Sequence, residues 1–138
     1  MSPDQISRGP RALIVEDEAL IAEELRARLS DLGFSVIAAV DSAEEGIEIA
    51  TTEQPDLVLM DIRLKGGKDG VQAAEDIREV SDVAIVYLTA HSDRLTVDRA
   101  KRTDHDGFIL KPFRRDDLQS TIQVAMLRRA RRAKKRLQ

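Results

Sequence analysis

Residues 57–70 read LVLMDIRLKGGKDG, a hydrophobic run that ends on Asp61 and continues into a polar, glycine-rich loop. The run does not alternate polar and apolar residues, which is typical of a strand with both faces covered by helices. One aspartate at the end of a strand is usually a turn residue or a helix cap. Asp61 is therefore a candidate functional residue only if other segments bring chemically complementary side chains to the same place.

The segments around this run predict an α/β fold. Apolar runs predict five short buried strands, at residues 12–15, 34–40, 56–60, 83–88 and 107–110. Helical spacing predicts five helices, which start near residues 18, 42, 70, 92 and 115. Gly33 is the expected residue just beyond the first helix, and Ser42 with Glu45 matches a capping box. Alternating strands and helices indicate a doubly wound parallel sheet flanked by five helices.

The composition indicates one soluble globular domain. The chain has 138 residues, of which 42% are hydrophobic and 34% are charged, and this length is enough for a full core. The absence of cysteine excludes a disulfide framework, a thiolate zinc site and a cysteine nucleophile. No apolar run approaches the roughly 18 residues that a membrane span needs. Residues 1–10 lack the apolar segment of a signal peptide, so we expect a cytoplasmic protein.

The net charge of −3 conceals two oppositely charged parts. Residues 128–138, RRARRAKKRLQ, hold 7 of the 22 lysines and arginines and no acid, so residues 1–127 carry 15 basic and 25 acidic side chains, a net charge of −10. We therefore divide the chain into a flexible N-terminal arm (1–10), a globular domain (11–127) and a basic C-terminal helical extension or linker (128–138).

The basic segment has three interpretations. It is a solvated extension of the last helix, the start of a linker to a further domain, or a contact for nucleic acid or an acidic membrane surface. The last is the least favoured, because the segment has no aromatic side chains to stack on bases and no helix-turn-helix beside it.

Polar side chains follow four of the five predicted strands. Glu16 and Asp17 follow the first, Asp61 follows the third, Thr89 ends the fourth and Lys111 follows the fifth. The carboxyl ends of parallel strands share one edge of a sheet, and open α/β sheets bind their ligands at that edge. The sequence therefore predicts that these side chains form one site.

The chemistry of these side chains points to a metal and a phosphoryl group. Converging acids raise one another's pKa values unless positive charge lies among them. Lys111 supplies one positive charge, and a hard divalent cation would supply the rest. Mg²⁺ favours carboxylate and carbonyl oxygens, and it commonly shares its coordination shell with phosphate. We therefore expect Mg²⁺ as the cofactor and a carboxylate as the nucleophile.

At this point a family resemblance is clear. Over residues 11–127 the chain resembles a response-regulator receiver domain, the phosphoacceptor module of bacterial two-component signalling. The resemblance implies a flavodoxin-like sheet with strand order 2-1-3-4-5, and a phosphorylated signalling switch that assists its own phosphorylation and dephosphorylation rather than a classical enzyme. The motifs that carry it are LIVEDE at 13–18, DLVLMDIRL at 56–64, DG at 69–70, VYLTA at 86–90 and FILKPF at 108–113.

The resemblance assigns roles at the acidic end of the site. Asp61 matches the aspartate that is phosphorylated and also binds the metal. Asp17 matches the acid that binds Mg²⁺ directly, and Glu16 matches its neighbour, which acts largely through metal-bound water. Arg63 matches the position whose backbone carbonyl completes the metal shell. A phosphatase with an aspartate nucleophile is disfavoured, because Arg63 stands where such enzymes need a second acid.

The resemblance also assigns the switch residues. Thr89 matches the hydroxyl that binds the new phosphate, and Lys111 matches the lysine that pairs with the phosphoryl oxygens. The bond between Lys111 and Pro112 is expected to be cis, which is uncommon enough to mark a positioned turn. Phe108 matches the aromatic switch residue, and without a hydroxyl it can act only through packing.

The sequence departs from the family pattern around the acceptor. Lys65 replaces the usual proline four residues beyond Asp61, and the loop to Gly70 is one residue longer than is common. Arg63 and His91 occupy the two positions that tune water access in this family. Both are large, so we expect them to slow hydrolysis of the phosphoryl group.

The resemblance implies specific partners. The phosphoryl donor is expected to be a sensor histidine kinase, a histidine phosphotransfer protein or a small acyl phosphate. Helix 92–103, strand 107–110 and the helix that starts near residue 115 form the face that is expected to switch and to support a possible homodimer. A stand-alone receiver, a relay intermediate and a module excised from a longer regulator or hybrid kinase all remain open.

Overall fold

The structure is a computed structural model that describes residues 9–90, 94–103 and 105–137. Most of the predicted N-terminal arm, and His91, lie outside the described residues. Five strands form one parallel sheet in the order β2-β1-β3-β4-β5, which confirms the predicted fold class and strand order. The strands are β1 (Arg11–Val15), β2 (Ser35–Val40), β3 (Leu57–Asp61), β4 (Ala84–Ala90) and β5 (Gly107–Lys111).

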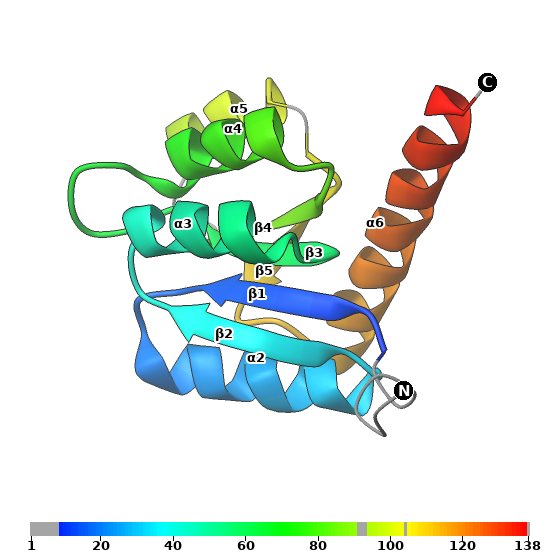
Figure 1. The fold of residues 1–138 in the computed structure, drawn as a ribbon. Coiled ribbons are helices and arrows are strands. Elements are labelled where there is room, and N and C mark those ends of the chain that lie inside the picture. The colour runs from blue at the N-terminus through cyan, green and yellow to red at the C-terminus, as the bar shows by residue number, and fades with distance from the viewer. Residues whose placement is uncertain (1–8, 91–93, 104, 138) are drawn as a thin grey trace.

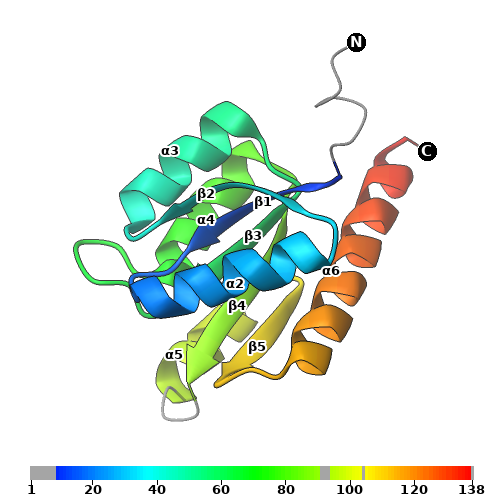
Figure 2. The same ribbon diagram turned by 90° about the horizontal axis from the view of Figure 1, so that it is seen from below.

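Helices cover both faces of this sheet (Figures 1 and 2). The helices are α2 (Ala19–Asp31), α3 (Ala43–Glu53), α4 (Gly70–Val80), α5 (Arg94–Lys101) and α6 (Arg115–Arg136). Buried residues of α3, α4 and α5 pack together on one face, and those of α2 and α6 pack on the other. This arrangement explains why the central strands are hydrophobic without alternation.

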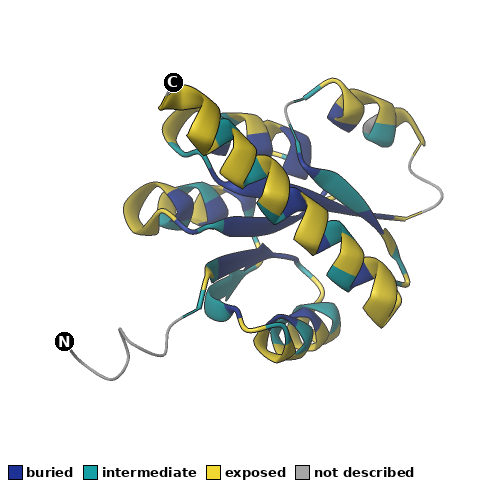
Figure 3. Ribbon diagram, turned by 90° about the vertical axis from the view of Figure 1, so that its right-hand side faces the viewer, coloured by how far each residue is buried: buried dark blue, intermediate teal, exposed yellow. Residues whose placement is uncertain are grey.

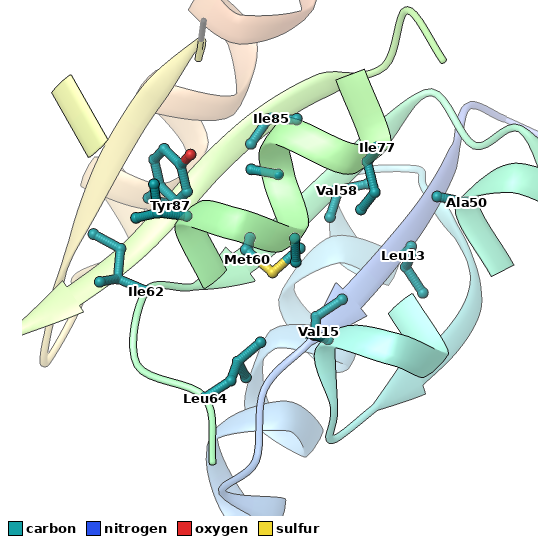
Figure 4. Close-up of a cluster of buried hydrophobic side chains, with 14 of the residues drawn as sticks. Leu13, Val15, Ala50, Val58, Met60, Ile62, Leu64, Ile77, Ile85 and Tyr87 are labelled. Carbon is teal, nitrogen blue, oxygen red and sulfur yellow. The ribbon is translucent and has the colours of Figure 1, made fainter. Parts of the chain in front are cut away.

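The core on the α3–α4–α5 face contains the largest fully buried side chain, Tyr87 on β4. Figure 4 shows Met60 and Val58 of β3 in this cluster together with Val15 of β1 and Ile77 of α4. The opposite cluster includes Leu25 and Leu29 of α2 with Leu118, Ile122 and Ala125 of α6. Each of these helices thus buries one apolar face in a core.

Local sequence signals define where the helices begin and end. Gly33, just beyond α2, has φ +92°, a left-handed conformation that glycine adopts without strain. Ser42 accepts a hydrogen bond from Glu45 N and caps α3, but the Glu45 side chain accepts from Ser42 Oγ rather than closing a full capping box. The complete capping box is the one at α4, where Asp69 and Gln72 bond each other's backbone N–H.

Helix α6 continues through the basic segment to Arg136, with much of its outward side exposed (Figure 3). Its inward side binds the amino-terminal edge of the sheet. Arg132 Nη1 lies 2.5 Å from Asp106 Oδ1, and Arg78 of α4 lies 3.1 Å from Asp106 Oδ2. Asp106 also accepts from Ile85 N at 2.9 Å, and its side chain is fully buried. Arg128 Nε lies 3.6 Å from Asp106 Oδ1 as well, so three arginines and a backbone N–H compensate this buried charge.

A second aspartate extends the contact. Arg132 Nε donates to Asp82 Oδ1 at 3.3 Å, and Arg136 also pairs with Asp82. Arg129 donates to Asp82 O at 2.9 Å and pairs with Asp56 Oδ1 at 3.0 Å. The sequence left open whether this segment is a solvated extension or a linker, and here it is a helix held to the domain by ion pairs. None of the helices within the described residues is long and apolar enough to cross a membrane.

Candidate functional site

The carboxyl edge of the sheet brings together acids from two strands. Glu16 and Asp17 follow β1, and Asp61 is the last residue of β3, the strand beside it. One carboxylate oxygen from each of the three residues lies within 4.8 Å of the others. Glu16 and Asp61 are buried, while Asp17 is half-buried. The side chains predicted to converge from these two segments do lie together.

Lys111, the last residue of β5, reaches across this edge to two of the acids. Its Nζ lies 2.6 Å from Glu16 Oε1 and 3.2 Å from Asp61 Oδ2. The Lys111–Pro112 peptide bond is cis. The ammonium thus lies between the two buried carboxylates and compensates part of their charge.

Backbone contacts hold Asp61 in place. Arg63 N donates to Asp61 Oδ1 at 3.0 Å, and Gly70 N donates to Ile62 O at 2.9 Å. A Cβ on Gly70 would lie 1.9 Å from the carbonyl oxygen of Asp61, so only glycine fits without a shift of the backbone. The loop therefore returns directly against the residue that carries the central carboxylate.

The three charged groups shift one another's pKa values. Burial, together with the neighbouring Glu16 carboxylate, raises the pKa of Asp61 to about 7. Burial also disfavours the charged forms of Glu16 and Lys111, but their mutual attraction outweighs it, so the pKa of Glu16 is lowered and that of Lys111 is raised. One ammonium thus compensates only part of the charge of the two buried carboxylates.

This donor set fits Mg²⁺. All three groups offer carboxylate oxygens, the ligand type that Mg²⁺ prefers. A bound dication favours the ionised form of a carboxylate and so opposes the raised pKa of Asp61. Both oxygens of Glu16 and both oxygens of Asp61 already have a partner, and Lys111 is shared between the two acids. Asp17 makes no hydrogen bond or ion pair among the described residues, so it is the acid most available to an ion.

A pocket of about 540 Å³ opens beside the cluster. It provides room for a phosphoryl group next to Asp61 and Lys111. Its lining residues are Asp17, Glu18, Asp61, Arg63, Leu64, Lys65, Ala90 and Lys111.

Thr89 is buried, and no hydrogen bond joins its hydroxyl to Asp61 among the described residues. Its hydroxyl donates to Ala90 O at 3.3 Å, and it lines a separate pocket of about 650 Å³ together with Phe108. Thr89 and Phe108, the two predicted switch residues, therefore line one pocket, and residues of α5 and β5 form most of the rest of its wall.

Sequence reasoning missed the aromatic cluster behind this second pocket. The ring centroids of Phe108 and His105 lie 4.5 Å apart, and that of Tyr87 lies 5.5 Å from Phe108. Tyr87 shares a 3.0 Å hydrogen bond with Thr103 Oγ1. The motif VYLTA places Tyr87 two residues before Thr89, but a strand residue at that position reads only as core.

Two expectations stay predictions. The use of the Arg63 carbonyl as a metal ligand is not tested, although Arg63 does lie on the wall of the pocket. His91 lies outside the described residues, so its effect on water access is also untested.

Comparison with known proteins identifies the family. The family model of the response regulator receiver domain matches residues 12–123. The chain belongs to this family. Receiver domains of response regulators are signalling switches of two-component systems rather than classical enzymes, and their partners are histidine kinases or phosphotransfer proteins.

Similar proteins agree with this assignment. The receiver is 37% identical over 118 residues to the transcriptional regulatory protein PdtaR of Mycobacterium tuberculosis, across 86% of this chain and 57% of that protein. A solved receiver domain of a modulated diguanylate cyclase from Desulfovibrio desulfuricans is 36% identical, with a TM-score of 0.82, over 88% of this chain and 96% of that one.

One solved structure contains a metal. The receiver domain of a sensor histidine kinase from Pseudomonas aeruginosa, crystallised with a magnesium ion in its active-site cleft, is 29% identical with a TM-score of 0.77, over 86% of this chain and 98% of that one. The receiver spans about half the length of the curated relatives it matches, from 42% to 57% of each.

Proposed function

We propose that this receiver takes a phosphoryl group onto Asp61 from a phosphohistidine of a sensor kinase or a histidine phosphotransfer protein. The observation that carries the proposal is the position of Lys111 Nζ, 2.6 Å from Glu16 and 3.2 Å from Asp61, beside Asp17 and an open pocket. These are the charges that an in-line phosphoryl transfer needs around the acceptor.

In this reaction an ionised Asp61 oxygen forms a bond to phosphorus while the bond to the donor nitrogen breaks. Lys111 neutralises phosphoryl oxygens. Asp17, Asp61 and the Arg63 carbonyl would hold Mg²⁺, and Glu16 would act through water. Bound Mg²⁺ supplies positive charge that offsets the charge on the phosphoryl oxygens. The Arg63 N–H fixes the carboxylate by donating to Asp61 Oδ1.

The phosphorylated form is proposed to switch the α5–β5–α6 face. Phosphate adds a charge of about −1.5 to −2, which attracts the Thr89 hydroxyl away from Ala90 O. Phe108 then fills space beside Thr89, since both line the same pocket. Such a change is a shift between two packings of the same chain.

The same face is proposed to bind a second phosphorylated copy. It carries exposed apolar side chains on each of its three elements, which are Leu95 on α5, Leu110 on β5 and Val124 on α6. Sedimentation of the phosphorylated and unphosphorylated protein tests this, and a monomer in both states would contradict it.

We also propose that the receiver unit extends to Arg136, since Arg129, Arg132 and Arg136 bind aspartates of the domain. A role in nucleic-acid binding is not favoured, because these arginines are engaged within the chain. The proposed location is the cytoplasm, where histidine kinases phosphorylate their receivers. Output and cognate kinase stay open.

The test is phosphorylation by acetyl phosphate with Mg²⁺, followed by mass spectrometry. We expect one phosphoryl group on the receiver, none on Asp61→Asn, and normal labelling of Asp76→Asn, which removes an exposed carboxylate from α4. Labelling of Asp61→Asn would overturn the proposal.

Once labelled, the protein also tests the proposed shielding of the phosphoryl group. Alanine at both Arg63 and His91 is expected to shorten the lifetime of the phosphoryl group, and an unchanged lifetime would contradict their role in water access.

A further inference from the structure

We propose that Lys65 binds the anionic leaving group of small acyl phosphate donors, so that among small-molecule donors the receiver prefers those that release a carboxylate over those that release an amine. This inference rests on the proposed phosphorylation of Asp61 and adds the class of donor that the same pocket favours.

The position of Lys65 is the first observation. Lys65 is exposed, four residues beyond Asp61, and it lines the same pocket of about 540 Å³ as Asp61 and Lys111. A donor whose phosphorus lies beside Asp61 therefore extends into a space that Lys65 borders.

The second observation is that the ammonium of Lys65 is uncommitted. Across residues 9–90, 94–103 and 105–137, Lys65 makes no hydrogen bond or ion pair. By contrast, Lys111 pairs with Glu16 and Asp61, and Lys68 in the same loop pairs with Asp76. Lys65 is therefore a cation in this pocket that an incoming anion can engage without breaking an existing ion pair.

The chemistry of transfer places an anion there. An Asp61 oxygen bonds to phosphorus, and the bond from phosphorus to the acyl oxygen breaks on the opposite side. The electron pair stays on that oxygen, which departs as a carboxylate and needs no proton. Lys65 stabilises the charge that grows on this oxygen. In phosphoramidate the nitrogen already carries the proton that it needs, so when its bond to phosphorus breaks it departs as neutral ammonia, and a cation gives it no such help.

The experiment compares acetyl phosphate with phosphoramidate at fixed Mg²⁺ concentration. The rate of Asp61 phosphorylation is measured on mobility-shift gels for the wild type, Lys65→Ala, Lys65→Glu and Lys68→Ala. Lys68→Ala is the matched control, because it removes the same charge from the same loop outside the pocket lining. Urea unfolding verifies that all variants fold.

We expect Lys65→Ala to slow transfer from acetyl phosphate by about three- to five-fold, the range of an exposed ion pair, and Lys65→Glu to slow it more. Transfer from phosphoramidate stays at the wild-type rate, and the effect on acetyl phosphate shrinks as salt is added. Lys68→Ala behaves as the wild type with both donors.

An equal loss with both donors, or the same loss in Lys68→Ala, overturns the role of Lys65 and leaves phosphorylation of Asp61 intact. A wild-type protein that accepts phosphate from neither donor, in contrast, overturns the proposed function itself.

Discussion

Arg132 on α6 and Asp106 before β5 form an ion pair of 2.5 Å at the edge of the sheet opposite the acidic site. The Asp106 side chain has no exposed surface, whereas the Arg132 side chain is 26% exposed. Burying a charge is costly unless it is paired, so α6 is held at this end by a contact that the domain cannot lose without leaving Asp106 under-compensated.

Replacing Arg132 with alanine is expected to lower the free energy of unfolding by about 2–3 kcal/mol, somewhat less than is typical for a broken buried pair because Arg78 still binds Asp106. Urea unfolding measures this. The control is Arg131→Ala, since Arg131 is exposed and makes no ion pair among the described residues. It is expected to lower the free energy of unfolding by less than about 0.5 kcal/mol. Equal losses in the two variants would contradict the pairing.

The same contact makes stability depend on pH. Burial alone would raise the pKa of Asp106, but Arg132, the Ile85 N–H and Arg78 outweigh it and hold this pKa below its ordinary value of 3.8. The stabilisation is therefore complete above that ordinary value and is lost as pH falls through the lower pKa of the folded state. The difference in unfolding free energy between the wild type and Arg132→Ala should shrink below about pH 4. A difference that widens in acid would refute this.

Gly70→Ala is expected to disturb Asp61 directly, because the new Cβ would lie 1.9 Å from its carbonyl oxygen. Relief of this overlap requires a backbone shift, with a loss of about 1–3 kcal/mol in unfolding free energy and slower phosphorylation by acetyl phosphate. The matched variant is Gly67→Ala in the same loop, whose Cβ meets only Glu44 Oε1 at 3.7 Å. A normal phosphorylation rate in Gly70→Ala would show that the loop does not position the acceptor.

Mg²⁺ is expected to stabilise the folded receiver by about 2.7 kcal/mol at a concentration 100 times its dissociation constant. Asp17→Asn removes one of the three clustered carboxylates and should weaken this stabilisation strongly. Thermal unfolding with and without Mg²⁺ measures it. Asp41→Asn, an exposed acid near Asp17 but outside the cluster, should respond as the wild type, and a loss of the same size there would indicate unspecific attraction.

The sequence predicts the fold and the acidic half of the site well. Continuous hydrophobic runs identify buried strands such as β3. Since Asp61 comes directly after such a run in the sequence, its place at the carboxyl end of β3 could be predicted without the structure. Glu16 and Lys111 meet Asp61 because parallel strands deliver their carboxyl ends to one edge. The meeting of these three side chains depends on the sheet topology, which the hydrophobic periodicity and the turn residues of the sequence indicate.

Contacts that depend on side-chain direction could not be predicted. The Thr89 hydroxyl donates to Ala90 O, and Thr89 lines a pocket with Phe108, contacts that depend on the side-chain rotamer. The partners of Arg132 lie 26 and 50 residues away in the sequence, and a run of arginines at the end of a chain usually reads as a solvated surface. Asp106 likewise reads as a turn residue until the fold buries it.

Ion pairs hold strand β5 at both of its ends. Lys111 ties one end to Glu16 and Asp61, and Asp106 ties the other to Arg132. Only about 16 Å separates these anchors at the usual rise of a strand. In the proposed phosphorylated form, binding of a phosphate oxygen to Lys111 is therefore expected to displace the residues between the two anchors, where Phe108 lies, rather than to shift the whole strand.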